Sequence, residues 1–281
     1  MMNTFCVPIV VITKDRTRYL DITLKSLSAT VPHTVPVFIA SDGSSDQGML
    51  KYLTTNERVS LSGLEFPNDH PQWVEHIGVL ANNESVDGIA GKVNVIMRKV
   101  SAGIKNIGFA VKFAFDTTGA SHVVKIEDDI IFKNGWYKRV CRSLLGNSSV
   151  GLLSGFRYFY GNPKFKAFDD DVELITEGYT GGPMMAVSRT VLERCPYMFV
   201  NELTYIIDND DFWINQTRST GLATAVTLKG ECQHIGVLTE AGHKPYMRDG
   251  KIVKIDHHIF PPYGMVSAVA KFAGECNLLH E

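Results

Sequence analysis

Two short acidic segments of the sequence combine residue types that could bind a cation and move a proton. Glu-Asp-Asp at 127–129 directly follows an apolar run at 123–126, and Asp-Asn-Asp-Asp occupies 208–211. Adjacent carboxylates repel one another, and a hard divalent cation with oxygen ligands relieves this repulsion most directly. A solvated acidic turn is the ordinary alternative for such a triplet. The position of 127–129 in the fold therefore decides between the two interpretations.

The elements before the acidic triplet follow an α/β pattern. Residues 7–13 form a β-branched, apolar run, Leu20, Leu24 and Leu27 recur at helical spacing, and 35–40 is a second apolar run. Strands that are apolar on both faces and joined by a helix imply a parallel sheet covered on both sides. Such sheets bind ligands at the carboxyl ends of their strands. The triplet follows a strand of this kind, which favours a ligand site over a solvated turn.

The rest of the chain predicts further helices and strands without a repeat or a linker. We expect helices over 104–115, 136–144 and 189–194, a short helix that opens at 208–211 and ends at Gly221, strands at 123–126, 150–154, 184–187 and 222–228, a polar loop at 161–171 and a flexible bend at 178–182. Residues 54–92 show no clear pattern. One domain over residues 1–281 is the prediction.

Composition and charge exclude several classes of protein. Of the 281 residues 44% are hydrophobic, which predicts a substantial core, and the net charge of -2 excludes a nucleic-acid binder held by bulk electrostatics. Apolar runs reach about half a dozen residues, whereas a membrane span needs roughly 20. The first residues lack a basic region and a cleavage site, so a cytoplasmic location is expected, in the host if the source is viral. Five dispersed cysteines without a CxxC pair predict reduced, buried thiols.

Four segments, in this order, resemble motifs of GT-A glycosyltransferases. They are 8–16, a strand ending in Asp-Arg, Ser-Asp-Gly at 41–43, Ile-Glu-Asp-Asp-Ile at 126–130, and Asp-Asp-Phe-Trp at 210–213. The Glu-Asp-Asp form resembles the N-acetylglucosaminyltransferase I family, here in an anchorless microbial or phage form. The resemblance implies a GT-A fold, a Rossmann-like and mostly parallel sheet flanked by helices. It also implies a nucleotide-sugar-binding half at 1–130 and an acceptor-binding half at 131–281.

The resemblance further implies an inverting transfer from a UDP-sugar, with a role for each matching residue. Asp129 is the expected ligand of Mn2+ or Mg2+, which bridges the two phosphates, and Asp211 is the expected catalytic base, with Asp210 as the next candidate. The expected nucleotide-sugar contacts are Thr13, Arg16, Asp42, Glu127, Asp128, Gly181 and Gly182. Arg16 and Asp42 have ordinary turn residues as their alternative. The two glycines match the family only loosely, and a close backbone turn is their ordinary interpretation.

His234 is a second expected metal ligand, because Gln-His-Ile-Gly at 233–236 resembles a segment of other GT-A families in which a histidine reaches the metal. A strand-end histidine satisfied by hydrogen bonds is its alternative. For the acceptor a glycan is favoured. The named alternative is DNA with hydroxymethylated pyrimidines, since Lys138, Arg139 and Arg142, and the basic segment 243–254 with its tyrosine, suit a phosphate backbone and an extruded base.

Two other functions compete with transfer from a UDP-sugar. A sugar nucleotidyltransferase shares the strand and helix layout, but it uses a glycine-rich loop after the first strand, and residues 13–17 contain no glycine. An inactive nucleotide- or carbohydrate-binding module is the non-enzymatic alternative. The presence of both Asp129 and Asp211 argues against it.

Overall fold

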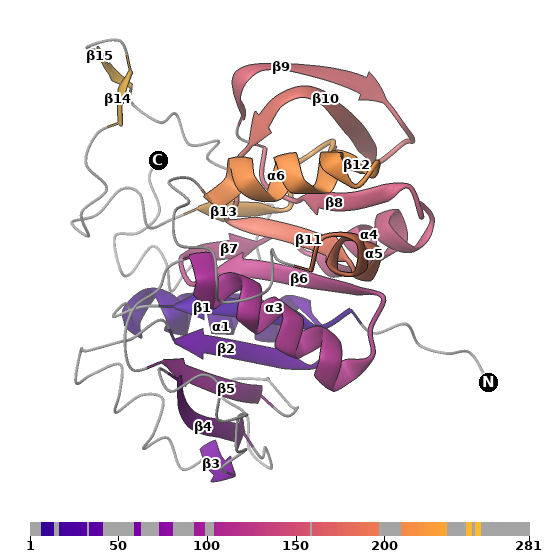
Figure 1. Cartoon of the computed structure of the whole chain (residues 1–281). Helices are drawn as coiled ribbons and strands as arrows, with labels where there is room; N and C mark the ends of the chain where they lie inside the picture. Colours follow the sequence, from indigo (N-terminus) through magenta and orange to yellow (C-terminus); the bar gives the residue numbers. More distant parts are fainter. Residues whose placement is uncertain are drawn as a thin grey trace.

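A computed structural model gives the arrangement of most of the chain (Figure 1). The structure describes residues 7–13, 17–32, 34–41, 59–62, 73–80, 93–98, 104–157, 159–196, 209–234, 246–248 and 251–253. The helices are α1 (Thr17–Thr30), α3 (Ile104–Thr118), α4 (Trp136–Leu145), α5 (Arg189–Arg194) and α6 (Asn209–Ser219). Among these residues, no helix has the length and hydropathy that crossing a bilayer requires.

Eleven of the described strands form one sheet. They are β1 (Ile9–Thr13), β2 (Val37–Ser41), β3 (Val59–Ser62), β4 (Trp73–Leu80), β5 (Val93–Arg98), β6 (His122–Glu127), β8 (Val150–Ser154), β9 (Phe159–Ala167), β10 (Val172–Thr180), β11 (Met184–Ser188) and β12 (Ala223–Thr227). Their order is β3-β4-β5-β2-β1-β6-β11-β8-β12-β10-β9. The sheet thus contains strands from both predicted halves of the chain.

The middle of the sheet is parallel, as the first βαβ pattern predicts. Strands β5, β2, β1 and β6 run in one direction, with Val11 opposite Ile39 on one side and Ile126 on the other. Strand β11 lies antiparallel between β6 and β8, and β12 is again parallel to β8. Because β1 and β6 end side by side, the residues that follow them meet at one edge.

Helices cover both faces of the sheet, since alternate strand residues point to opposite sides. Ile9 and Val11 pack with α1 and α4 on one face, whereas Val10 packs with α3, α5 and α6 on the other. In Figure 1, α3 and α6 lie on the same side of the sheet. The α/β fold class is therefore confirmed.

One local prediction is wrong, and another is right only for its last residues. Residues 161–171, predicted as a polar loop, belong largely to β9, which pairs antiparallel with β10, and β10 continues through the predicted bend at 178–182 as far as Thr180. Strand β9 is an edge strand with many exposed side chains, so neither burial nor alternation marks it in the sequence. Pro163 fits this place, because an edge strand tolerates a residue without a backbone N–H.

Two small pairings complete the described structure. Strand β7 (Ile130–Phe132) pairs antiparallel with β13 (Cys232–His234), and β14 (Tyr246–Arg248) pairs with β15 (Lys251–Val253). The first pairing brings the segment that follows the acidic triplet against a strand from near the end of the described chain. It thereby places Cys232–His234 beside the candidate site.

Candidate active site

The acidic triplet lies where β1 and β6 end together. Ile12 of β1 is opposite Glu127 of β6 in the parallel register, so Thr13 and Asp128 are neighbours. The Thr13 hydroxyl donates a hydrogen bond of 2.6 Å to Asp128 Oδ2, and the Asp128 residue is only 2% exposed. The two predicted nucleotide contacts are therefore bound to each other, and their contact with a nucleotide stays a prediction.

Side chains of helix α1 form hydrogen bonds with the backbone of the triplet and of the residues that follow it. The Thr23 hydroxyl lies 2.7 Å from the Asp128 carbonyl oxygen and 2.8 Å from the Ile130 carbonyl oxygen, and it accepts the Ile130 N–H. One turn further along, Ser26 Oγ accepts the Phe132 N–H. Both hydroxyls are buried. The helix between the first two strands thus fixes the turn that carries the acidic residues.

Asp129 is fully buried, and it lies close to β13. Burial raises the pKa of the Cys232 thiol well above its ordinary value, and the nearby charges of Glu231, Glu127 and Asp129 raise it further. The β13 backbone places His234 opposite Ile130, one residue after Asp129. The side chain of His234 lies outside the described part. The backbone positions of the two predicted metal ligands, Asp129 and His234, are therefore close in space. Their common role stays a prediction.

The residues around Asp129 suit an oxygen-binding cation. A buried carboxylate needs hydrogen-bond donors or a cation around it, and carboxylate oxygens are the ligands that Mg2+ and Mn2+ prefer. Within the described ranges, no three His, Cys, Asp or Glu side chains are grouped to hold a metal ion. Mg2+ is usually bound by one or two carboxylates together with substrate phosphates. A single buried carboxylate is compatible with that kind of site, and metal binding by Asp129 stays a prediction.

A bend at 181–183 connects the triplet to the second acidic segment. The Gly182 N–H donates a hydrogen bond of 2.7 Å to Asp210 Oδ2, at the start of α6. A Cβ added at Gly182 would lie 1.8 Å from Asp210 Oδ1, so only glycine allows this close approach. On the other side of the bend, the Glu127 N–H donates to the Pro183 carbonyl oxygen at 2.9 Å. The two predicted acidic segments thus meet at this bend.

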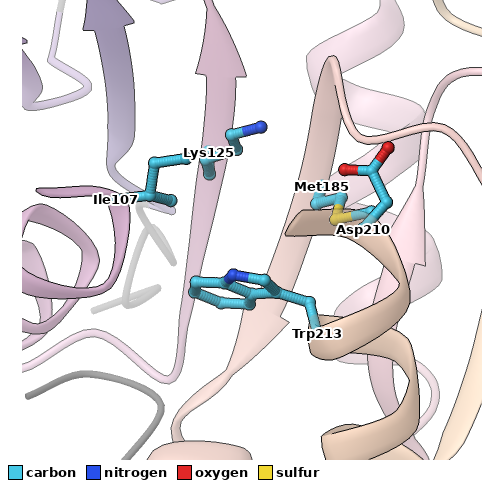
Figure 2. A pocket seen from close by; sticks show the side chains of 5 residues that line it. All are labelled: Ile107, Lys125, Met185, Asp210 and Trp213. Atoms are coloured by element: carbon cyan, nitrogen blue, oxygen red, sulfur yellow. The ribbon is translucent and has the colours of Figure 1, made fainter. Parts of the chain in front are cut away.

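The Lys125 side chain binds both the acidic triplet and the bend at 181–183. Its Nζ donates hydrogen bonds to the Gly182 carbonyl oxygen at 2.7 Å and to Glu127 Oε1 at 3.2 Å. The residue is only 3% exposed, although its side chain carries an ammonium group. Figure 2 shows the Lys125 amine and the Asp210 carboxylate at the upper end of a small hollow, whose lower wall is the Trp213 indole. The Lys125 ammonium group and the Asp210 carboxylate therefore both bind Gly182, and the apolar side chains of Ile107, Met185 and Trp213 line the hollow that they share.

Asp210 and Asp211 both belong to the first turn of α6. Acidic side chains are favourable there, because the N-terminus of a helix carries a partial positive charge. Both are partly exposed, unlike Asp129. Asp210 is held by Gly182, whereas Asp211 is the next residue along the turn. Its role as the base stays a prediction. Arg16 and Asp42, predicted to contact the uridine, lie outside the described residues.

The predicted basic cluster is largely neutralised by ion pairs. Arg139 binds both carboxylate oxygens of the buried Glu231, at 3.0 and 3.1 Å from its Nε, and the hydrogen bonds with Glu231 raise the pKa of Arg139. Arg142 pairs with Asp171. Lys138 is exposed. This weakens one of the two basic segments that suggested a DNA acceptor. Of the other, 243–254, only 246–248 and 251–253 belong to the described residues, and the DNA acceptor stays a prediction.

Comparison with known proteins gives distant structural similarity. No protein-family model matches the sequence, and no curated protein matches it. The fold is similar to S. aureus TarS 1–349, with a TM-score of 0.49, 14% identity, and coverage of 81% of this chain and 59% of that one. Structures of TarS 1–349 with UDP-GlcNAc and with UDP match at TM-scores of 0.49 and 0.47, each at 13% identity. This chain thus spans less than two thirds of TarS 1–349, and the likeness is too distant to assign an activity.

Three residues of the site were not predicted. Thr23 and Ser26 lie on the buried face of α1, where a hydroxyl among leucines is the only signal in the sequence. Lys125 interrupts an otherwise apolar strand, and this interruption is a signal that the strand pattern hides. Its partner Gly182 is 57 residues away. Buried polar residues inside apolar runs therefore mark this site better than the runs themselves.

Proposed function

We propose that this chain is a metal-dependent, inverting glycosyltransferase that transfers a sugar from a UDP-sugar to a hydroxyl group, with a glycan as the favoured acceptor. The observation that carries the proposal is the meeting of two acidic segments at the bend 181–183, beside the ends of β1 and β6. This edge is where α/β sheets bind ligands. The order of motifs that resembles the N-acetylglucosaminyltransferase I family supports the same conclusion.

The donor is proposed to lie against the carboxyl ends of β1, β2 and β6. Arg16 and Asp42 would hold the uridine, and Glu127, whose side chain is one third exposed, lies on the same edge. Asp129, with His234 beside it, would hold Mn2+ or Mg2+. When bound, the cation neutralises charge on the diphosphate as it becomes the leaving group.

Asp211 is the proposed base of the transfer. Its carboxylate would accept the proton of the acceptor hydroxyl while that oxygen forms a bond to the anomeric carbon. The bond from this carbon to the diphosphate oxygen breaks, and UDP leaves with the electron pair. Attack from the face opposite the leaving group inverts the anomeric configuration. Asp210, which accepts the Gly182 N–H through one of its oxygens, is the next candidate.

Release of UDP from a panel of UDP-sugars in the presence of Mn2+ tests the proposal. We expect Asp211→Asn to keep donor affinity and to lose about 10²–10⁴-fold in turnover, the usual contribution of a general base. Asp210→Asn is the matched control, since its amide oxygen can still accept the Gly182 N–H. An inactive Asp210→Asn with an active Asp211→Asn would move the base to Asp210. No turnover of any UDP-sugar, or retention at the anomeric carbon, would contradict the proposal.

A further inference from the structure

We infer that Lys125 is a positioning residue, which couples the acidic triplet to the start of α6 through Gly182. For its catalytic meaning the inference rests on the proposed function. Lys125 is not expected to contact the nucleotide, the cation or the acceptor. It acts through the residues that it binds. On one side it pairs with Glu127, and on the other it binds the residue that holds Asp210.

Because Lys125 is buried, its ammonium group depends on these contacts to offset the loss of hydration. A lysine is almost never fully buried unless it is paired, because an uncompensated ammonium group is costly in an apolar environment. Lys125 points to the α3 and α6 face, where Ile107, Met185 and Trp213 line the same hollow. None of these three offers a strong hydrogen-bond acceptor. Asp210 lines the same hollow, and the ammonium group donates its hydrogen bonds to the Gly182 carbonyl oxygen and to Glu127 Oε1.

Gly182 transmits the position of Lys125 to α6. Its carbonyl oxygen accepts from Lys125 at 2.7 Å, and its N–H donates to Asp210 at 2.7 Å. Gly182 has no side chain to pack, and the approach of Asp210 leaves no room for a Cβ. Hydrogen bonds on both sides of one residue thus fix the bend. If the Lys125 ammonium is removed, the bend loses one of these two anchors, and Asp210 and its neighbour Asp211 lose their fixed place.

A double-mutant cycle in chemical denaturation tests this coupling without any turnover. We expect Asp210→Ala to change the unfolding equilibrium constant about tenfold less in the Lys125→Met background than in the parent, which corresponds to about 1.4 kcal/mol. Lys133→Met is the matched control, because the Lys133 ammonium also donates to a backbone carbonyl, that of Lys229, away from Gly182. Its cycle with Asp210→Ala should be additive. If Lys125→Met does not fold, Lys125→Gln enters the same cycle.

Kinetics separate positioning from mere stabilisation. We expect Lys125→Met to lower kcat by about 10–100-fold with little change in the affinity for UDP and Mn2+, since small misplacements of reacting groups cost up to about 10²-fold. Lys133→Met should retain kcat. An additive Lys125 cycle, or an unchanged kcat in Lys125→Met, overturns the inference. A coupled cycle in a parent that turns over no UDP-sugar upholds the link through Gly182 and overturns the proposed function instead.

Discussion

Replacing Gly182 by alanine perturbs the bend with the smallest possible side chain. The new Cβ would lie 1.8 Å from Asp210 Oδ1 and 2.6 Å from Asp210 Cγ, whereas real Cβ contacts are essentially never shorter than 3.0 Å. Asp210 or the bend must therefore move by at least about 1 Å. The Gly182 N–H would then lose its hydrogen bond to Asp210 Oδ2.

The size of the effect follows from that displacement. A hydrogen bond to a charged group contributes about 1.5–3 kcal/mol to stability, so Gly182→Ala should lower the free energy of unfolding by about that amount. A displacement of about 1 Å in a positioned group can cost about 10²-fold in rate. Because UDP is proposed to lie against the carboxyl ends of β1, β2 and β6, we expect kcat to fall and the affinity for UDP to change little.

Denaturant titration, together with initial rates of UDP release per folded molecule, measures both effects. Gly119→Ala is a matched control, since Gly119 ends α3 with a φ of +65° and a Cβ there meets nothing within 4 Å. It should cost about 1–2 kcal/mol through backbone strain and leave kcat unchanged. Asp210→Ala should relieve the steric cost of Gly182→Ala in the double variant. Full turnover in Gly182→Ala, or additive stability losses in the double variant, would refute this reasoning.

Two further predictions concern charged groups outside the bend. Burial lowers the pKa of His122 to about 4 from 6.5, so the unfolded chain is protonated first, and the free energy of unfolding should fall by up to about 3 kcal/mol as the pH drops through this interval. Denaturant titrations of His122→Gln should lack most of this fall, and an equal fall in both proteins would contradict it. Arg139→Met should cost about 2–3 kcal/mol, because it leaves the buried Glu231 without its ion pair, whereas Arg142→Met at an exposed pair should cost less than about 1 kcal/mol. Equal thermal shifts of the two arginine variants would show that the burial of Glu231 does not matter.

Elements with two buried faces could be predicted from the sequence. The apolar run at 150–154 has the same bounds as β8, in which every residue is buried. The parallel pairing of β1 with β2 follows from the first βαβ pattern. Burial on both faces selects apolar residues at successive positions, so these elements carry a clear signal. Strands β9 and β10 lack it, because part of each is exposed at the end of the sheet.

The acidic segments of the candidate site stand out in the sequence, whereas the contacts that connect them do not. The acidic segments stand out because unpaired carboxylates after a strand are costly. The link from Lys125 to Gly182 depends on a backbone carbonyl, which every residue has, so no residue type identifies it. The pairing of Arg139 with Glu231 is hidden in the sequence for another reason. Glu231 is 92 residues away from Arg139, and a basic cluster without a nearby acidic residue in the sequence suggests an unpaired surface.

Calorimetric titration of UDP into the protein, with Mn2+ and then with a chelator, tests the central claim most directly, because it needs no acceptor. We expect UDP binding that depends on Mn2+ in the parent and in Asp171→Ala, an acidic control that pairs with Arg142. Asp129→Ala should lose this dependence, because the other acids of the triplet do not replace a direct ligand. Binding of UDP to Asp129→Ala with the same Mn2+ dependence as the parent, or no binding to the parent at all, would show that Asp129 does not hold a metal for the donor.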